Sequence, residues 1–249
     1  MQTIKLLEKR AAAPRLFVLR FEKPEGFTFK AGQFARLGLA LEGEAEPVMR
    51  AYSIASASSA ETLDFFVTAV PEGKLSPRLT ALEPGETVLL DGEAQGNLLP
   101  ERIPGGDTLW LFATGSGLSP FASILRDPAA RGAWPEIVLV ESVRKAEEAV
   151  LARELGGELK DEAKLRVFVS TTRETDPSRQ GDFCERIPAL LASGELERVV
   201  GRPLDPTHAR VLLCGNPGFV DAMRAELKTR GIVSPRFGRP GQLVVETFW

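Results

Sequence analysis

Residues 113–125, ATGSGLSPFASIL, place two glycines between an apolar run and a helical one. The run Leu109–Ala113 predicts a strand and Pro120–Arg126 predicts a helix, with Ser119 as a candidate N-cap. Glycines let a backbone approach a ligand closely, and a helix N-terminus offers unpaired N–H groups to a phosphate. The spacing is Gly-x-Gly-x-x-Pro rather than the usual dinucleotide fingerprint. It therefore predicts either a phosphate-binding turn of another kind or a purely structural turn.

The rest of the second half continues this alternation of strands and helices. The predicted strands are Ile137–Val140, Leu165–Thr171 and Arg210–Leu213, and the predicted helices are Ala146–Leu155, Ile187–Ala192 and Gly218–Arg230. Such alternation is typical of a doubly wound parallel sheet covered by helices, in which ligands bind at the carboxyl ends of the strands. We therefore expect an α/β domain here.

The first hundred residues follow a different pattern, in which short strand-like segments are separated by turns such as KPEG and VPEG. The predicted strands are Arg15–Phe21, Gln33–Leu39, Arg50–Ala55, Leu63–Val70 and Thr87–Leu90, and one helix is predicted at Ser76–Leu82 with Ser76 as its cap. This spacing predicts an antiparallel barrel or sandwich. The change of pattern near residues 102–106 predicts two domains, 1–102 and 103–249.

Composition excludes several classes of function. The formal net charge of the 249 residues is −3, and neither half is polarised, so we expect no nucleic acid and no membrane as partner. No apolar run is long enough for a membrane span. Only Cys184 and Cys214 are present, so we expect no metal site, no disulfide framework and a cytoplasmic protein.

Four arginines stand out by their positions in or after strand-like segments. In the strand-like RAYS at residues 50–53, Arg50 and Tyr52 share one face and Ser53 takes the other. A solvated surface strand explains such a pattern equally well. Three arginines also end or follow strand-like segments of the second half, and guanidinium groups suit phosphate monoesters. We interpret these three, Arg144, Arg173 and Arg186, as a candidate phosphate site.

Together these motifs resemble those of bacterial ferredoxin/flavodoxin–NADP+ reductases, an FAD-containing family, over essentially the whole chain. The resembling segments are RAYS at 50–53, VPEGKLSPRL at 70–79, ATGSGLSPF at 113–121, TTRET at 171–175, CGNP at 214–217 and the final Phe248-Trp249. The resemblance implies an N-terminal antiparallel six-stranded β-barrel that holds FAD. It also implies a C-terminal α/β doubly wound parallel sheet that holds NADP(H), with a C-terminal tail that returns to the flavin.

The resemblance further implies a set of FAD contacts. Arg50 pairs with the pyrophosphate, Tyr52 lies against the isoalloxazine, and Ser53 reaches the N5 region. The whole implied set is Arg50, Ala51, Tyr52, Ser53, Phe66, Val67, Thr68, Ala69, Lys74, Leu75, Ser76, Ser116, Phe248 and Trp249. Either Phe248 or Trp249 would stack on the flavin as a movable lid.

The nucleotide side is implied in the same way. The NADP contacts would be Arg144, Arg173, Arg186, Gly215, Asn216 and Asp221, and the polar groups around the nicotinamide and N5 would be Ser53, Cys214 and Glu246. Two departures stand out: Glu141 takes the place of an expected histidine, and Glu185 that of an expected glycine. Both would bring a negative charge near the 2′-phosphate.

The implied function is electron transfer between NADPH and ferredoxin or flavodoxin by a monomeric flavoenzyme. One alternative is an NADH-using flavin reductase component of an oxygenase or haem system. Another is a non-catalytic FAD-binding subunit of a larger enzyme.

Overall fold

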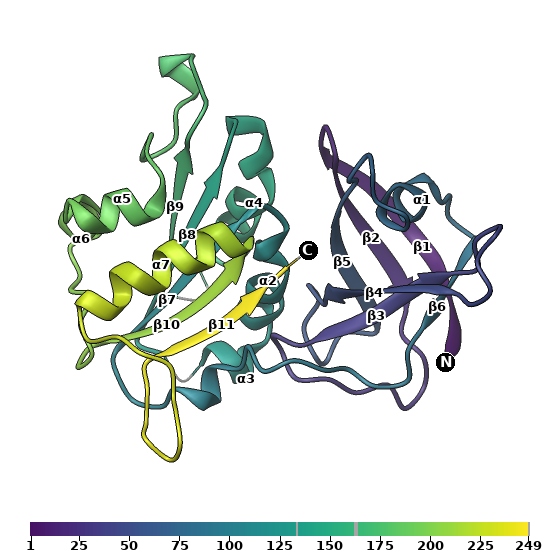
Figure 1. Ribbon diagram of the computed structural model, residues 1–249, viewed down its shortest axis with the longest axis horizontal. Coiled ribbons are helices and arrows are strands. Elements are labelled where there is room, and N and C mark those ends of the chain that lie inside the picture. The colour runs from purple at the N-terminus through teal and green to yellow at the C-terminus, as the bar shows by residue number, and fades with distance from the viewer. Residues whose placement is uncertain (133, 162–163, 249) are drawn as a thin grey trace. The chain divides into compact units, whose positions relative to one another are not determined.

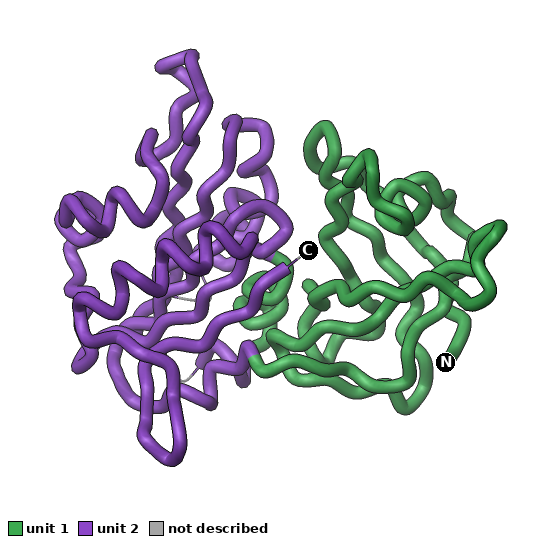
Figure 2. Tube along the Cα trace, viewed as in Figure 1, with its two compact units in different colours: residues 1–97, 119–127 green, residues 98–118, 128–249 purple. Residues whose placement is uncertain are grey.

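The chain forms two compact units, seen in a computed structural model that describes residues 1–132, 134–161 and 164–248 (Figure 1). The first unit comprises residues 1–97 and 119–127, and the second comprises residues 98–118 and 128–249 (Figure 2). The segment 119–127, which lies between two stretches of the second unit in the sequence, therefore packs as part of the first.

The first unit is built on a six-stranded antiparallel sheet. Its strands are β1 (Gln2–Ala13), β2 (Leu16–Glu22), β3 (Phe34–Leu39), β4 (Val48–Ser53), β5 (Thr62–Thr68) and β6 (Thr87–Leu90), in the order β4-β3-β6-β1-β2-β5. The first and last strands in this order also meet, because Ile54 pairs with Phe65 and the Ala55 N–H donates to the Asp64 carbonyl at 2.7 Å. This closure confirms the six-stranded antiparallel barrel.

Strand β1 is the member that the segment-by-segment prediction did not include. Only Ile4 and Leu6 of its first seven residues are buried, and they alternate with charged or exposed positions. The strand is held by pairing with β2 on one side and β6 on the other. Its existence therefore depends on long-range pairing more than on its own apolar pattern.

Helix α1 (Ser76–Ala81) begins one residue earlier than its predicted cap implies. Leu75 is the N-cap residue, and Ser76 is already helical. The prediction that Ser76 caps the helix is wrong, because its Oγ accepts a hydrogen bond from the Val70 N–H at 3.1 Å instead.

The second unit is a five-stranded parallel sheet with helices, which confirms the predicted α/β class. The strands are β7 (Thr108–Thr114), β8 (Glu136–Val143), β9 (Leu165–Thr171), β10 (Ala209–Gly215) and β11 (Leu243–Thr247), in the order β11-β10-β7-β8-β9. Its helices are α3 (Pro128–Arg131), α4 (Val150–Glu158), α5 (Ile187–Ala192), α6 (Glu195–Val200) and α7 (Pro217–Thr229). Short 3₁₀ turns add η1 (Pro100–Arg102), η2 (Gly115–Leu118), η3 (Ala146–Ala149) and η4 (Pro177–Arg179).

The order of these strands reverses between β7 and β10. From β7 the chain proceeds outward to β8 and β9, and it then returns to β10 and β11 on the other side. Ligands of open α/β sheets bind at such a switch point, beyond the carboxyl ends of the strands.

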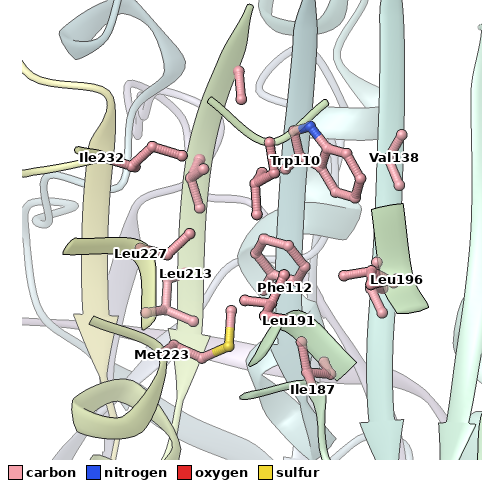
Figure 3. Packing of buried hydrophobic residues seen from close by; sticks show 14 of the residues in the cluster. Trp110, Phe112, Val138, Ile187, Leu191, Leu196, Leu213, Met223, Leu227 and Ile232 are labelled. Atoms are coloured by element: carbon pink, nitrogen blue, oxygen red, sulfur yellow. The ribbon is translucent and has the colours of Figure 1, made fainter. Parts of the chain in front are cut away.

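One face of the parallel sheet carries a large hydrophobic core. Alternate residues of the central strands, including Trp110, Phe112, Val138 and Leu213, pack with residues of α5, α6 and α7 (Figure 3). The rings of Trp110 and Phe112 stack with centroids 5.7 Å apart. Because strand residues alternate between faces, the neighbours of these residues point to the opposite side of the sheet.

Helix α2 (Ser119–Arg126) is attached to the barrel by buried hydrogen bonds. The Ser119 Oγ accepts from the Phe66 N–H at 3.3 Å, and the Ser123 Oγ donates to the Ser56 carbonyl at 2.7 Å. The prediction that Ser119 is the N-cap of this helix is wrong. The turn η2 runs directly into α2, so Ser119 is already helical, and its hydroxyl group contacts β5. Helix α2 thus belongs structurally to the first unit.

Candidate functional site

Strand β4 presents the residues predicted to face a flavin. Arg50 and Ala51 are exposed, Tyr52 is half-buried and Ser53 is buried. Burial raises the pKa of Tyr52 to about 12, against a smaller opposite effect of the Arg50 charge. The phenol therefore keeps its proton at neutral pH and presents a neutral aromatic ring beside a guanidinium group.

The end of β5 lies next to the end of β4. Ile54 follows Ser53 and pairs with Phe65, so the predicted segment Phe66–Ala69 begins one residue beyond this pair. Phe66 and Val67 are buried, whereas Thr68 and Ala69 are half-buried. The barrel thus brings together two of the three FAD segments predicted within residues 1–102.

The third segment, at the start of α1, is linked to β4 through Glu44. The Lys74 Nζ lies 2.6 Å from the Glu44 Oε1. Lys74, and to a smaller extent Arg50, lower the pKa of Glu44. Leu75 is buried in the barrel core. The positive charges of Lys74 and Arg50 therefore both act on one carboxylate, a charge arrangement that fits an anionic diphosphate.

In the second unit, two turns approach each other closely where the strand order reverses. A Cβ on Gly117 would lie 2.4 Å from the Cys214 carbonyl oxygen, and one on Gly215 would lie 2.3 Å from the Thr114 Oγ1. Ser116, between Gly115 and Gly117, is half-exposed. Both positions therefore require glycine, and the backbones after β7 and β10 form one surface.

Helix α7 begins at this surface. Asn216 is its N-cap, and the side-chain Oδ1 accepts from the Phe219 N–H at 3.0 Å. Asp221 is exposed in the same helix. The structure accordingly brings Ser116, Gly215 and Asn216 to one end of the sheet, with Asp221 one turn further along.

The three predicted arginines are exposed at the same carboxyl edge. The Arg173 N–H donates to the Arg144 carbonyl at 2.9 Å, so the turns after β8 and β9 are joined. Arg186 is the N-cap residue of α5, and the segment before it pairs with β9 through Phe183 and Ser170. The parallel sheet thus gathers three guanidinium-bearing positions at one edge.

Cys214 and Glu246 are neighbours on adjacent strands. They are paired in register, and the Cys214 Sγ lies 3.9 Å from the Glu246 Oε1. Burial, followed by the Glu246 charge, raises the pKa of the Cys214 thiol, which therefore stays neutral. The Phe248 N–H donates to the Gly215 carbonyl at 3.0 Å, whereas Trp249 lies outside the described residues. Ser53, the third predicted polar group, belongs to the barrel unit.

The prediction that Glu141 brings a negative charge near the 2′-phosphate is wrong. Strand β8 extends to Val143, three residues beyond the predicted end, and the Glu141 side chain is only 1% exposed. Burial raises the pKa of Glu141 to about 8, so its carboxyl group is largely protonated at neutral pH. Glu185, the second departure, is exposed beside Arg186.

Sequence reasoning missed two acidic residues that hold the arginine-bearing turns. The Glu148 Oε2 accepts from the Arg144 N–H at 2.8 Å, and the Glu174 Oε2 accepts from the Ala146 N–H at 3.2 Å. Glu148 lies three residues after Lys145, the N-cap residue of η3, which is the acidic position of a capping box. Lys145 stands where that signature has Ser or Thr, so the sequence pattern did not indicate the role of Glu148.

Two kinds of feature are absent from the residues that the structure describes. No helix among them is both long and apolar enough to cross a membrane. In the same part of the chain, no group of three or more His, Cys, Asp or Glu side chains could hold a metal ion.

Comparison with known proteins bears on both units. Residues 4–98 match the family described as "Oxidoreductase FAD-binding domain", and residues 111–225 match "Oxidoreductase NAD-binding domain". The chain is 38% identical to ferredoxin–NADP reductase A of Sorangium cellulosum, covering 97% of this chain and 87% of that protein. It is 39% identical to the flavodoxin/ferredoxin–NADP reductase of Escherichia coli, covering 94% and 93%.

A solved structure is similar over almost the whole chain. The ferredoxin NADP+ reductase of Neisseria gonorrhoeae, determined with bound FAD and NADP, superposes with a TM-score of 0.91 at 35% identity. The match covers 99% of this chain and 98% of that one.

Proposed function

The chain belongs to the ferredoxin/flavodoxin–NADP reductase family, and we propose from its own residues how it exchanges electrons between NADPH and a one-electron carrier. We propose that the barrel domain, 1–102, binds FAD and that the α/β domain, 103–249, binds NADP(H), with a C-terminal tail that returns to the flavin. The observation that carries the nucleotide assignment is the convergence of three exposed arginines with the Gly117 and Gly215 turns at one sheet edge.

The barrel residues divide the work of holding FAD. Arg50 and Lys74 would neutralise the pyrophosphate, the Tyr52 ring would lie against the isoalloxazine, and Ser53 would donate near N5. When bound, FAD supplies the two-electron exchange with NADPH and the one-electron exchange with the carrier. Ala51, Phe66–Ala69, Leu75 and Ser76 would line the remainder of this surface. Ser116, which belongs to the second unit, would also contact FAD.

Glu44 must give up its contact with Lys74 for this arrangement to form. The contact is solvent-exposed and therefore weak, whereas a diphosphate offers the same cations a larger charge. Lys74 and Arg50 would thus exchange a carboxylate for the phosphates when the dinucleotide binds.

The residues at the sheet edge would select the phosphorylated nucleotide. Arg144, Arg173 and Arg186 would hold the 2′-phosphate, because a guanidinium group binds phosphate oxygens in a bidentate manner. Gly215 and Asn216 would lie along the pyrophosphate side, with Asp221 on α7 beyond them. The neutral thiol of Cys214 cannot act as a nucleophile at neutral pH, so we propose that Cys214 and Glu246 only position the nicotinamide.

The C-terminal aromatic residues complete the proposal. Phe248, Trp249 or both would stack on the flavin as a lid that moves when the nicotinamide needs the same space, since stacking adds only about 0.5–1.5 kcal/mol beyond burial. We propose ferredoxin or flavodoxin as the carrier, and a monomeric protein in the cytoplasm.

The assignment of FAD is tested by the flavin that the purified protein retains. We expect FAD, because Arg50 and Lys74 together suit a diphosphate and FMN has only one phosphate. Arg50→Ala should weaken FAD retention by about tenfold or more, since a hydrogen bond to a charged group contributes roughly 1.5–3 kcal/mol. FMN as the only extracted flavin would contradict the assignment.

The function itself is tested by anaerobic titration of the holoenzyme with NADPH, followed by addition of ferredoxin or flavodoxin. We expect NADPH to bleach the flavin absorbance and the carrier to restore it. Bleaching by NADH alone would favour a reductase component of an oxygenase or haem system. No bleaching by either nucleotide would indicate a non-catalytic FAD-binding subunit.

A further inference from the structure

Glu141 is a buried carboxyl group that the proposed chemistry does not use. Three buried side-chain nitrogen or oxygen atoms of the described residues lack a hydrogen-bond partner, and the Glu141 Oε2 is the only carboxylate oxygen among them. An ionised carboxylate is costly to bury without a partner, so this group is held in its neutral form. Such an isolated acid in the middle of a sheet calls for a physical explanation.

The environment of Glu141 contains two charged side chains. Strand alternation puts Glu141 on the face opposite the Trp110–Phe112 core, and its strand neighbours are Ala113 on β7 and Val169 on β9. The charges that act on Glu141 are those of Glu148 in η3, which disfavours its ionisation, and Arg153 in α4, which favours it. The nearby turn η2 has the sequence GSGL and supplies no titratable side chain.

Both charged neighbours of Glu141 also hold the turn that carries Arg144. The Glu148 Oε2 accepts from the Arg144 N–H at 2.8 Å and from the Lys145 N–H at 3.4 Å. The Arg153 Nη1 donates to the Ala146 carbonyl at 3.2 Å. A negative charge on Glu141 would repel the Glu148 carboxylate and attract the Arg153 guanidinium group, and would therefore act on the two side chains that hold residues 144–146.

We propose that Glu141 is a positioning residue that makes the affinity for the 2′-phosphate of NADPH depend on its protonation, through the turn of Arg144. Neutral Glu141 leaves Glu148 and Arg153 on the backbone of residues 144–146, which fixes Arg144 at the sheet edge. When Glu141 is ionised, the contacts of Glu148 and Arg153 with this backbone weaken, and the turn becomes more mobile. This inference rests on the proposed binding of NADP(H) at that edge.

The test is the pH dependence of nucleotide binding to the FAD-loaded protein. The dissociation constants of NADP+ and NAD+ are measured by titration calorimetry from about pH 6.5 to about pH 9.5, which brackets the pKa of Glu141. In the wild type we expect NADP+ affinity to fall several-fold on passing pH 8, with little change for NAD+. Glu141→Gln should lack this fall, because the amide does not ionise.

Proton uptake provides a readout that a merely structural role would not change. Since linkage is reciprocal, NADP+ binding near pH 8 should take up protons in the wild type and not in Glu141→Gln. Calorimetry in buffers of different ionisation enthalpy measures this uptake. Glu185→Gln, an exposed change beside Arg186, should retain both the fall and the uptake.

A second variant keeps the inference testable if Glu141→Gln does not fold. Glu148→Gln removes the charge that opposes ionisation of Glu141 and should move the fall in NADP+ affinity to lower pH. The inference would be overturned if NADP+ affinity fell above pH 8 in Glu141→Gln as it does in the wild type. It would also be overturned if this fall occurred at the wild-type pH in Glu148→Gln. Equal wild-type affinity for NADP+ and NAD+ at neutral pH would instead contradict the proposed function, and this inference with it.

Discussion

The two candidate sites are built in different ways. In the barrel, the predicted flavin surface consists of side chains that project from paired antiparallel strands, as Arg50 and Tyr52 do on β4. In the parallel sheet, the predicted nucleotide surface consists of backbone turns beyond the strands, where Gly117 meets the Cys214 carbonyl. The first kind of site depends on side-chain chemistry, and the second depends on how closely two backbones can approach.

The buried acids of the two units differ in a corresponding way. In the barrel, Asp64 is bound by Arg20 through two hydrogen bonds, at 2.9 and 3.0 Å. In the parallel sheet, Glu141 has an oxygen with no partner. The barrel thus satisfies the buried carboxylate of Asp64, whereas in the sheet burial raises the pKa of Glu141 to about 8.

The largest expected effect is the pH dependence of stability that Glu141 imposes. Its pKa is about 8 in the folded protein, against an ordinary value of 4.5. Between these values the folded state binds the extra proton, so the free energy of unfolding falls as pH rises, by up to about 1.4 kcal/mol per unit. Over the whole window the loss amounts to roughly 4–5 kcal/mol.

Urea denaturation of the wild type and Glu141→Gln at a series of pH values measures this difference. The variant should gain stability relative to the wild type as pH rises, whatever its stability at low pH. If the free energies of unfolding of the two proteins run parallel from pH about 5 to about 8, Glu141 is solvated or paired in solution.

The next largest effect concerns the close contact between the backbone turns after β7 and β10. In Gly117→Ala the new Cβ would lie 2.4 Å from a backbone oxygen, so one of the two turns must move. We expect a loss of about 3 kcal/mol in stability, at the upper end for overpacked sites, and a clear loss of NADP+ affinity. Chemical denaturation and calorimetry measure the two.

Gly157→Ala is the matched control for that substitution. It adds the same methyl group in α4, where nothing lies within 4 Å, and should stabilise the protein by about 0.5–1 kcal/mol. Wild-type stability and NADP+ binding in Gly117→Ala would mean that the turns after β7 and β10 do not touch.

The smallest effect tests the assignment of α2 to the barrel unit. Ser123→Ala removes a buried donor from the Ser56 carbonyl and should cost about 1–2 kcal/mol. Hydrogen exchange should show the loss of protection in the barrel strands. Ser193→Ala, whose hydroxyl bonds the nearby Leu190 carbonyl in the other unit, should leave those strands unaffected. Equal hydrogen exchange of the barrel strands in the two variants would contradict the assignment of α2 to the barrel unit.

Much of the fold could be predicted from local patterns, and the failures have physical causes. The strand–helix alternation of the second half predicted the parallel sheet because its strands are continuous apolar runs. Strand β1 was missed because two buried residues among charged ones form a weak signal, and pairing with β2 and β6 supplies the rest.

The candidate sites were predictable where the chemistry is carried by side chains. Arg144 and Arg173 stand out in the sequence, and the structure joins their turns at one edge. The protonation state of Glu141 was not predictable. It depends on the extension of β8 by three residues beyond its predicted end and on the charges of Glu148 and Arg153. Burial and neighbouring charge are tertiary properties that spacing along the chain does not encode.

The most direct test of the central claim is nucleotide selectivity in Arg173→Ala. The rate of flavin bleaching is measured anaerobically with saturating and subsaturating NADPH and NADH, in the wild type and the variant. If the arginines at the sheet edge hold the 2′-phosphate, the variant should need about tenfold or more NADPH for the same rate, since a charged contact contributes roughly 1.5–3 kcal/mol, while NADH kinetics stay unchanged. Equal losses with both nucleotides would contradict the account.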